Sequence, residues 1–206
     1  MRTMVIVNHP YEGSFCHALA DAAAQGARRA GRDVDLLDLD ASGFDPVMRR
    51  ADLAAWREHT TIDPVVADLQ RRIDAADHLV LVHPVWWETA PAVMKGFIDK
   101  VLVPGWAYED GAFGLPRGRF VRLQRVTVAT TMATPGPAYR WLFGNTAQKA
   151  SVRGVWQKMG VPARWLSHPR VAEVSPQRRE RWLARMEDRV AGVRLAPRDE
   201  ALVPVG

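Results

Sequence analysis

Short apolar runs alternate with longer amphipathic segments along most of the chain. The apolar runs are rich in β-branched residues and have the length of buried strands; they cover residues 3–8, 33–39, 78–83, 125–131 and 163–167. The amphipathic segments have helical spacing and cover residues 14–30, 64–76, 91–103, 138–159 and 176–193, with a break at Gly144-Asn145. Ser14 is expected to cap the first helix, and Gly31 to end it.

This alternation of five strands with helices predicts a parallel sheet that helices cover on both faces. The fold class is therefore a doubly wound α/β fold. No internal repeat, low-complexity tract or linker divides the chain, so we expect one domain over residues 1–194. The tail, residues 195–206, contains two prolines and is expected to be loose or docked on a neighbour.

Length and composition agree with one intracellular domain. A chain of 206 residues and 23.0 kDa is long enough to bury a sizeable core. The single cysteine, Cys16, excludes an internal disulfide framework and fits a reducing compartment. The apolar N-terminal run is too short for a signal peptide, and no run approaches the roughly 20 residues of a membrane helix. We therefore expect a soluble, cytoplasmic protein.

The loop after the first strand combines the features of an anion site. His9-Pro10-Tyr11-Glu12-Gly13-Ser14 leads directly into a helix, whose N-terminus presents free N–H groups to an anion. His9 and the Ser14 hydroxyl would add further donors. The loop has neither the dinucleotide fingerprint nor the P-loop spacing. A capped helix with a surface histidine explains the same residues equally well.

The most informative stretch follows the third strand, where a Pro/Trp-rich turn, residues 84–90, precedes a helix with Pro91 in its first turn. Ligands bind at the carboxyl ends of the strands in open parallel sheets. Trp86 and Trp87 have little core in which to be buried there, whereas a flat aromatic ligand such as a flavin ring would cover them. The fourth strand ends in Thr130-Thr131, whose hydroxyls and neighbouring amides could address such a ring, although an ordinary strand-to-helix connection is the alternative.

These three loops converge on one edge of the sheet. The first suits a phosphate, and the other two suit a flat polar ring. Together they predict a flavin site in a flavodoxin-like, five-stranded parallel sheet of order 2-1-3-4-5, with helices on both faces.

At this level of detail the chain resembles the NAD(P)H:quinone oxidoreductase (DT-diaphorase) family of flavodoxin-like flavoproteins, in its bacterial branch. The resemblance covers about residues 3–165 and is strongest from Asp77 to Tyr108. The matching segments are His9, Ser14-Phe15, Phe44-Asp45-Pro46-Val47, Ala75-Ala76-Asp77, Pro84-Val85-Trp86-Trp87, residues 91–101, Gly105-Trp106-Ala107-Tyr108 and Thr130-Thr131.

The resemblance implies a role for each matched site residue. His9, Ser14 and Phe15 would hold the phosphate or pyrophosphate of the flavin. Pro84, Val85, Trp86 and Trp87 would surround the isoalloxazine edge, chiefly through backbone groups, and Thr130 and Thr131 would complete that site. Trp106 and Tyr108 occupy positions where the family places aromatic side chains that cover the flavin of a partner subunit. A homodimer is therefore implied, with FAD as the expected cofactor and FMN as the alternative.

The chain also departs from the family pattern. Met132-Ala133 follows the two threonines, where the family usually has Gly-Gly, so this loop could differ in position or place a side chain over the ring. The tyrosine and histidine of the family's proton relay lack clean equivalents. Tyr139 lies near the tyrosine position and is our candidate catalytic residue, with water or an unrecognised group as alternatives.

The implied reaction is a two-electron reduction of quinones or similar planar acceptors by NADPH or NADH, through ping-pong hydride transfer. One alternative is a regulatory flavoprotein with little turnover, for example an ancillary subunit of an ion-efflux system. The other is a one-electron carrier, which the net charge of +5 argues against because such carriers tend to be acidic.

The remaining polar residues predict no further chemistry. The arginines at 178, 179, 181, 185 and 189 fit a solvated helix face better than a nucleic-acid surface, although they could also attract NADPH. Cys16 and His83 are expected to be packing residues. Asp38 and Asp40 are better explained by a solvated loop than by ribose binding. The histidines show no metal-ligand spacing, so we expect no metal, no nucleic acid and no membrane insertion.

Overall fold

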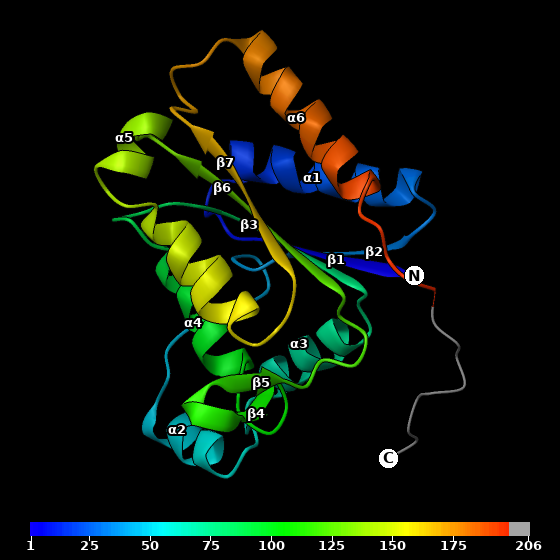
Figure 1. The fold of residues 1–206 in the computed structure, drawn as a ribbon, viewed down its shortest axis with the longest axis vertical. Coiled ribbons are helices and arrows are strands. Elements are labelled where there is room, and N and C mark those ends of the chain that lie inside the picture. Colours follow the sequence, from blue (N-terminus) through cyan, green and yellow to red (C-terminus); the bar gives the residue numbers. More distant parts are fainter. Residues whose placement is uncertain (198–206) are drawn as a thin grey trace.

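A five-stranded parallel sheet forms the centre of the protein (Figure 1), in a computed structural model that describes residues 1–197. Its strands are β1 (Arg2–Val7), β2 (Asp33–Asp38), β3 (His78–Pro84), β6 (Arg125–Met132) and β7 (Ala163–Pro169). They lie in the order β2-β1-β3-β6-β7. Because β4 (Tyr108–Asp110) and β5 (Pro116–Gly118) form a separate two-stranded sheet, this is the predicted order 2-1-3-4-5, and the predicted fold is confirmed.

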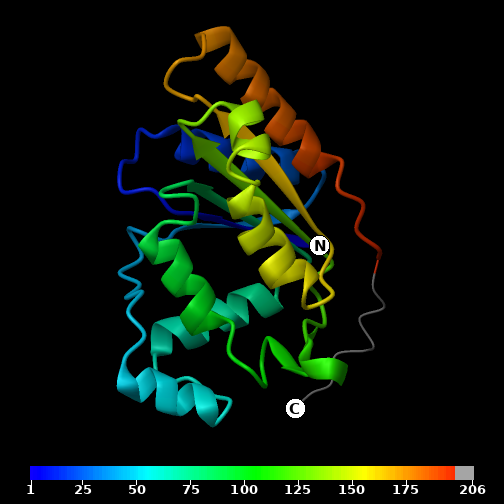
Figure 2. The ribbon, with the colours of Figure 1, turned by 60° about the vertical axis from the view of Figure 1, so that its left-hand side comes forward.

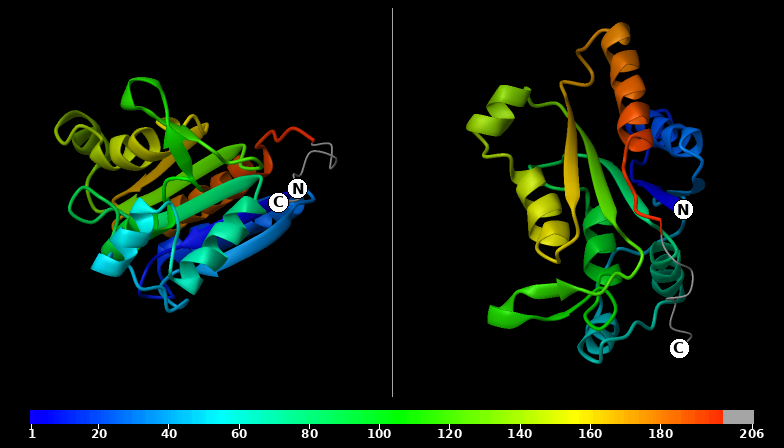
Figure 3. Two further views of the ribbon diagram at one scale, coloured as in Figure 1. Left: turned by 90° about the horizontal axis from the view of Figure 1, so that it is seen from below. Right: turned by 45° about the vertical axis from the view of Figure 1, so that its right-hand side comes forward.

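Helices cover both faces of the sheet, as Figures 2 and 3 show from other directions. One face carries α1 (Phe15–Arg29) and α6 (Pro176–Ala191), which pack against each other. The other face carries α3 (Pro64–Asp74), α4 (Ala92–Val101) and the π-helix η2 (Gln148–Gln157). The short helices α2 (Arg50–Arg57), α5 (Gly136–Trp141) and the 3₁₀ turn η1 (Ala112–Gly114) lie in connections.

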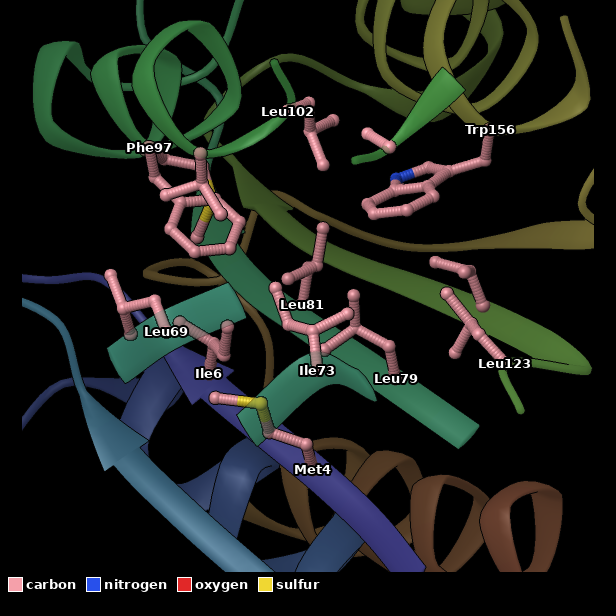
Figure 4. Packing of buried hydrophobic residues seen from close by; sticks show 14 of the residues in the cluster. Met4, Ile6, Leu69, Ile73, Leu79, Leu81, Phe97, Leu102, Leu123 and Trp156 are labelled. Carbon is pink, nitrogen blue, oxygen red and sulfur yellow. The ribbon is translucent and has the colours of Figure 1, made fainter. Parts of the chain in front are cut away.

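Alternate residues of each central strand supply two separate hydrophobic cores, because successive side chains point to opposite faces. Ile6 and Leu81 point towards α3 and α4, among the residues drawn in Figure 4. Val5, Val80 and Val82 pack against α1 and α6 on the opposite face. Burial on both faces explains why these strands are continuous apolar runs in the sequence.

Local signals set the element boundaries largely where the sequence predicts them. The Ser14 hydroxyl accepts a hydrogen bond from the His17 N–H at the start of α1, and Gly31 follows its end with a φ of 70°. The predicted break between α5 and η2 falls at Gly144 and Asn145, which have φ values of 69° and 60°. Pro91 caps α4 and is not part of its first turn.

Two elements were not predicted from the sequence pattern. Helix α2 is only eight residues long, and the carboxylate of Asp52 stabilises its start by accepting the Arg49 N–H at 2.8 Å. The β4–β5 hairpin has three residues in each strand and contains a proline and two glycines at or next to its strands. Neither element is long enough to show a clear periodicity.

Only residues 195–197 of the predicted tail are described. The Ala196 N–H donates to Gln124 Oε1 at 2.8 Å, and Gln124 Nε2 donates to the Ala196 carbonyl at 3.1 Å. The rest of the tail lies outside the described residues, and the domain boundary at residue 194 stays a prediction. Between residues 1 and 197, no helix is both long and apolar enough to cross a membrane.

Candidate functional site

The loop between β1 and α1 presents hydrogen-bond donors at the carboxyl edge of the sheet. His9 Nδ1 accepts the Tyr11 N–H at 3.1 Å, so in this arrangement the neutral His9 ring carries its proton on Nε2. The first turn of α1 contains no acidic side chain. Ser14 satisfies one of the free N–H groups of that turn, and those of Phe15 and Cys16 have no partner within the helix. His9 and this helix end therefore present donors to an anion, and the phosphate contact of His9, Ser14 and Phe15 stays a prediction.

The loop after β3 is held in an unusual conformation. Trp86 and Thr89 exchange backbone hydrogen bonds of 2.9 and 3.1 Å around a two-residue turn. The central residues Trp87 and Glu88 have φ values of 48° and 65°, the type I′ geometry that normally selects asparagine and glycine. Residues other than asparagine and glycine are strained at these two turn positions, and such strain clusters at functional sites.

The turn directs Trp87 into solvent. Its side chain is 97% exposed, and Trp86 is 45% exposed with its ring edge-on to His9 at 6.2 Å. Among the hydrogen bonds within residues 1–197, none uses the N–H groups of Trp87 or Glu88. An uncovered indole next to two free donors fits a planar ligand that carries acceptor atoms along its edge.

The two threonines at the end of β6 are buried and already bonded within the protein. Thr130 Oγ1 accepts from Trp165 Nε1 at 2.9 Å, and Thr131 Oγ1 lies 3.3 Å from Cys16 Sγ. The Thr131 carbonyl accepts the Val85 N–H at 2.8 Å. The threonines therefore join β6 to the loop after β3 and to α1. Their contribution to ring binding stays a prediction.

Three buried side chains around this edge, His83, His168 and Cys16, are neutral. Burial lowers the pKa of His83 to about 4 and that of His168 to about 4, although hydrogen bonds to the Pro84 and Thr130 carbonyls oppose the two shifts. Each of these rings donates from Nδ1. Burial also raises the pKa of Cys16 to about 11, against the opposing effect of its bond to Thr131. These groups stabilise the edge without carrying charge at neutral pH.

Met132, which stands where the family usually has glycine, extends β6 by one residue. Its side chain is buried in a small apolar cluster with Tyr139 and Ala147, against which Val85 and Trp165 pack. The side chain is thus directed into this cluster and does not lie over the exposed edge.

Tyr139 lies on α5 and is 1% exposed. It lines a cleft of about 340 Å³ together with Met132, Trp165 and Trp182, between α5, the end of β7 and the start of α6. Its hydroxyl accepts the Ala147 N–H at 2.8 Å and lies 3.1 Å from Thr146 Oγ1. The sequence singled out Tyr139 but gave no signal for Thr146, because the contact depends on the turn at Gly144-Asn145.

A second hollow of about 290 Å³ adjoins this region on α6. Three arginines and an aromatic ring line it: Arg178, Arg181, Arg185 and Trp182. The Arg178 guanidinium lies 5.2 Å from the Trp182 ring, which in turn contacts Phe15 at 6.1 Å. Within residues 1–197, none of these arginines pairs with a carboxylate. The prediction of an ordinary solvated helix face overlooked this hollow.

Tyr108 lies on β4, at the opposite end of the sheet from α5 (Figure 1), and Trp106 precedes it by two residues. Trp106 Nε1 donates to Asp74 Oδ2 at 2.9 Å, at the end of α3 and just before β3 begins. The seven residues of β3 separate this end from the carboxyl edge by about 20 Å. These two side chains could therefore reach a ligand at the carboxyl edge only in a second copy of the chain.

The Phe44-Asp45-Pro46-Val47 segment, which also carries the family resemblance, has a packing role. Phe44 is buried in the larger core. A Cβ atom on Gly96 would lie 2.3 Å from the Pro46 carbonyl oxygen, so only glycine lets α4 approach this segment. The matched glycine is explained by this contact.

The family profile described as flavodoxin-like fold matches residues 1–190. Over 147 residues the chain is 29% identical to NAD(P)H dehydrogenase [quinone] 1 of Cavia porcellus, covering 63% of this chain and 53% of that protein. It is 37% identical over 111 residues to the uncharacterized NAD(P)H oxidoreductase YcaK of Escherichia coli K12, covering 53% of this chain and 57% of that protein. The chain thus spans about half the length of the curated relatives it matches.

Solved structures share the fold across nearly the whole chain. The NAD(P)H:quinone oxidoreductase of Methanothermobacter marburgensis superposes with a TM-score of 0.81 at 21% identity, covering 93% of this chain and 96% of that one. An FMN-dependent NADH-azoreductase of Bacillus anthracis, in complex with FMN, superposes with a TM-score of 0.74 at 12% identity, covering 93% of this chain and 98% of that one. These structures confirm the fold, and the family profile together with the sequence relatives confirms the predicted resemblance.

Proposed function

The chain belongs to the flavodoxin-like fold family, and from that premise we propose that it is a flavin-dependent NAD(P)H:acceptor oxidoreductase. Its substrates would be quinones or similar planar acceptors, reduced by two electrons in a ping-pong cycle. The observation that carries this proposal is the Trp86–Thr89 turn, in which an indole and two free backbone donors are held exposed at the carboxyl edge. The names of the relatives support the same activity.

The residues at this edge fit a flavin. His9 Nε2 and the first turn of α1 would bind its phosphate, since both present donors without a competing carboxylate in that turn. The N–H groups of Trp87 and Glu88 would donate to acceptor atoms of the ring. A bound flavin supplies the hydride chemistry, while the protein supplies orientation and electrostatics. The Trp87 indole would limit the site to planar molecules that stack.

We propose FAD as the cofactor, with FMN as the alternative. The arginine-lined hollow on α6 supports FAD, because guanidinium groups bind phosphates through paired hydrogen bonds. Trp182 in this hollow contacts Phe15, which directly follows the proposed phosphate loop. The second phosphate of a dinucleotide would thus meet positive charge. The azoreductase that shares the fold binds FMN, which keeps the alternative open.

The proposed assembly is a homodimer in the cytoplasm. A partner subunit would bring Trp106 and Tyr108 to the active site, which the distance within one chain does not allow. NADPH and NADH, either of which could be the donor, are cytoplasmic molecules. Nothing in residues 1–197 favours the alternative of a regulatory flavoprotein.

Initial-rate kinetics test this function directly. We expect NADPH or NADH with menadione to give parallel lines in double-reciprocal plots, because donor and acceptor occupy the same site in turn. Intersecting lines would contradict the ping-pong cycle. If the flavin-bound protein shows no turnover, the proposal that it is an oxidoreductase is contradicted.

A further inference from the structure

A chain of three side chains connects Tyr139 with the strained turn after β3. The Tyr139 hydroxyl lies 3.1 Å from Thr146 Oγ1, which donates to Glu88 Oε2 at 2.9 Å. The Ala147 N–H donates to the Tyr139 oxygen at 2.8 Å. Glu88 is one of the two residues of positive φ in the turn.

The direction of these hydrogen bonds is fixed by counting donors. An ionised carboxylate only accepts, so the single proton of Thr146 points to Glu88. Thr146 Oγ1 must then accept from the Tyr139 O–H. If Glu88 takes up a proton and donates it to Thr146, the O–H groups of Thr146 and Tyr139 can both reverse their hydrogen-bond direction. The phenol proton is then free to leave Tyr139 in another direction.

The two ends of the chain lie in different surroundings. Tyr139 is buried and lines the cleft beside Met132 and Trp165. Glu88 is partly exposed to solvent. Hydrogen bonds thus lead from a phenol that lines the cleft, through one hydroxyl, to a partly exposed carboxylate.

We propose that Thr146 and Glu88 form a proton relay that supplies Tyr139 during reduction of the acceptor. The inference rests on the proposed function. Reduction of a quinone to a hydroquinone adds one hydride, which comes from NAD(P)H, and one proton. Tyr139 gives its proton to the quinone oxygen, Thr146 restores the phenol, and Glu88 restores Thr146 with a proton from water. Two carbonyl groups of the quinone thereby become two hydroxyls, and NAD(P)H becomes NAD(P)⁺.

The decisive variant is Thr146→Val, which keeps the shape of the side chain and removes its hydroxyl. Each variant is assayed with NADPH and two acceptors, menadione, which takes up protons, and ferricyanide, which takes an electron and no proton. We expect the menadione-to-ferricyanide rate ratio to fall by about tenfold or more, because proton transfer by positioned groups contributes about 10²–10⁴-fold. Thr146→Ser keeps the hydroxyl and should restore the ratio. Thr60→Val makes the same change in an exposed loop and is the control.

A measurement on the flavin-free protein separates the relay from turnover. The tyrosine Raman doublet reports whether a phenol donates or only accepts, and the difference from Tyr139→Phe isolates Tyr139. We expect a donating phenol in the wild type and in Thr146→Ser, and loss of that donation in Thr146→Val.

Each outcome decides the proposal. The relay is overturned if Thr146→Val has an unchanged menadione-to-ferricyanide rate ratio while NADPH still reduces its bound flavin. The proposed function would still stand in that case. A ratio that falls equally in Thr146→Val and Thr146→Ser also overturns it, since the hydroxyl is then irrelevant. A wild type that reduces neither acceptor overturns the proposed function and the relay with it.

Discussion

Trp87 has a backbone conformation that its own side chain disfavours. A tryptophan with φ of 48° in a type I′ turn is explained if the position must present an indole at the edge of the sheet. Its 97% exposure means that packing against residues 1–197 does not explain this tryptophan.

Replacing Trp87 with Ala should therefore weaken flavin binding and slow turnover. Stacking of a heterocycle on an aromatic side chain contributes about 1–3 kcal/mol, so the flavin Kd should rise by roughly 5- to 150-fold. Quenching of flavin fluorescence on titration of the flavin-free protein measures this Kd. Leu53→Ala, at an exposed apolar residue of α2, is the control. Equal effects of the two variants would show that Trp87 has no special contact with the ring.

Cys16 is a second residue with a definite expected behaviour. Its buried thiol lies against Thr131, and burial raises its pKa to about 11. A raised thiol pKa favours the protonated form, so the reactive thiolate stays scarce below about pH 10. We expect iodoacetamide to label the folded protein very slowly at pH 8, and Cys16→Ala to retain activity. Mass spectrometry measures the rate of labelling. Rapid labelling of the native protein would contradict the packing role of Cys16.

Residues whose roles depend on near neighbours were predictable, and those with distant partners were not. Ser14 caps the helix that directly follows it, so its role is visible in the sequence. The hydroxyl of Thr130 accepts from Trp165, and Thr146 donates to Glu88, 58 positions away along the chain. Only the assembled sheet shows such contacts.

At the level of elements, periodicity predicted the long helices and the five sheet strands because each is long enough to show its pattern. Strand β3 is a continuous apolar run since it is buried on both faces. Helix α2 and the β4–β5 hairpin are too short for this signal. Both also make contacts with distant residues, because Lys100 Nζ lies 3.7 Å from Asp52 of α2 and Tyr108 of the hairpin packs against the larger core. The hairpin carries Tyr108, one of the two residues that we propose cover the flavin of a partner subunit.

The contact between α1 and α6 predicts that a glycine-to-alanine exchange destabilises the protein, whereas helix propensity predicts that it stabilises the helix. Exchange of a glycine for alanine inside a helix normally stabilises it by about 1 kcal/mol. At Gly26, however, a Cβ atom would lie 2.2 Å from the Glu187 carbonyl oxygen. We expect Gly26→Ala to lower the free energy of unfolding by about 1–3 kcal/mol, the usual cost of overpacking. Urea denaturation measures it, with Gln25→Ala on the exposed face of α1 as the control. A stabilised Gly26→Ala would show that the two helices are not in close contact.

At the scale of the whole molecule, the sheet order brings the loops after β1, β3 and β6 to one edge, which the sequence predicted from the strand alternation together with the residues of these three loops. The arginine-lined hollow at this side was not predicted, because arginines at helical spacing look the same whether they face solvent or a ligand. Its position next to Trp182 and Phe15 is a property of the packed structure.

This hollow should distinguish the two flavins. The double variant Arg181→Ala and Arg185→Ala is expected to weaken FAD binding by about tenfold or more, since a hydrogen bond to a charged group contributes about 1.5–3 kcal/mol. FMN, which lacks the second phosphate, should bind as it does to the wild type. Calorimetric titration of the flavin-free protein with each flavin measures both affinities. Arg153→Ala, on the exposed surface of η2, is the control. Equal losses for FAD and FMN would show that the hollow does not hold the adenylate half.

The central claim is that the carboxyl edge of the sheet holds a flavin that NAD(P)H reduces. The most direct measurement is the absorbance spectrum of the purified protein, supplied with flavin if colourless, before and after anaerobic addition of NADPH or NADH. We predict flavin bands that bleach within seconds with at least one of the two donors. A protein that refuses added flavin, or whose bound flavin neither donor reduces, would contradict this account.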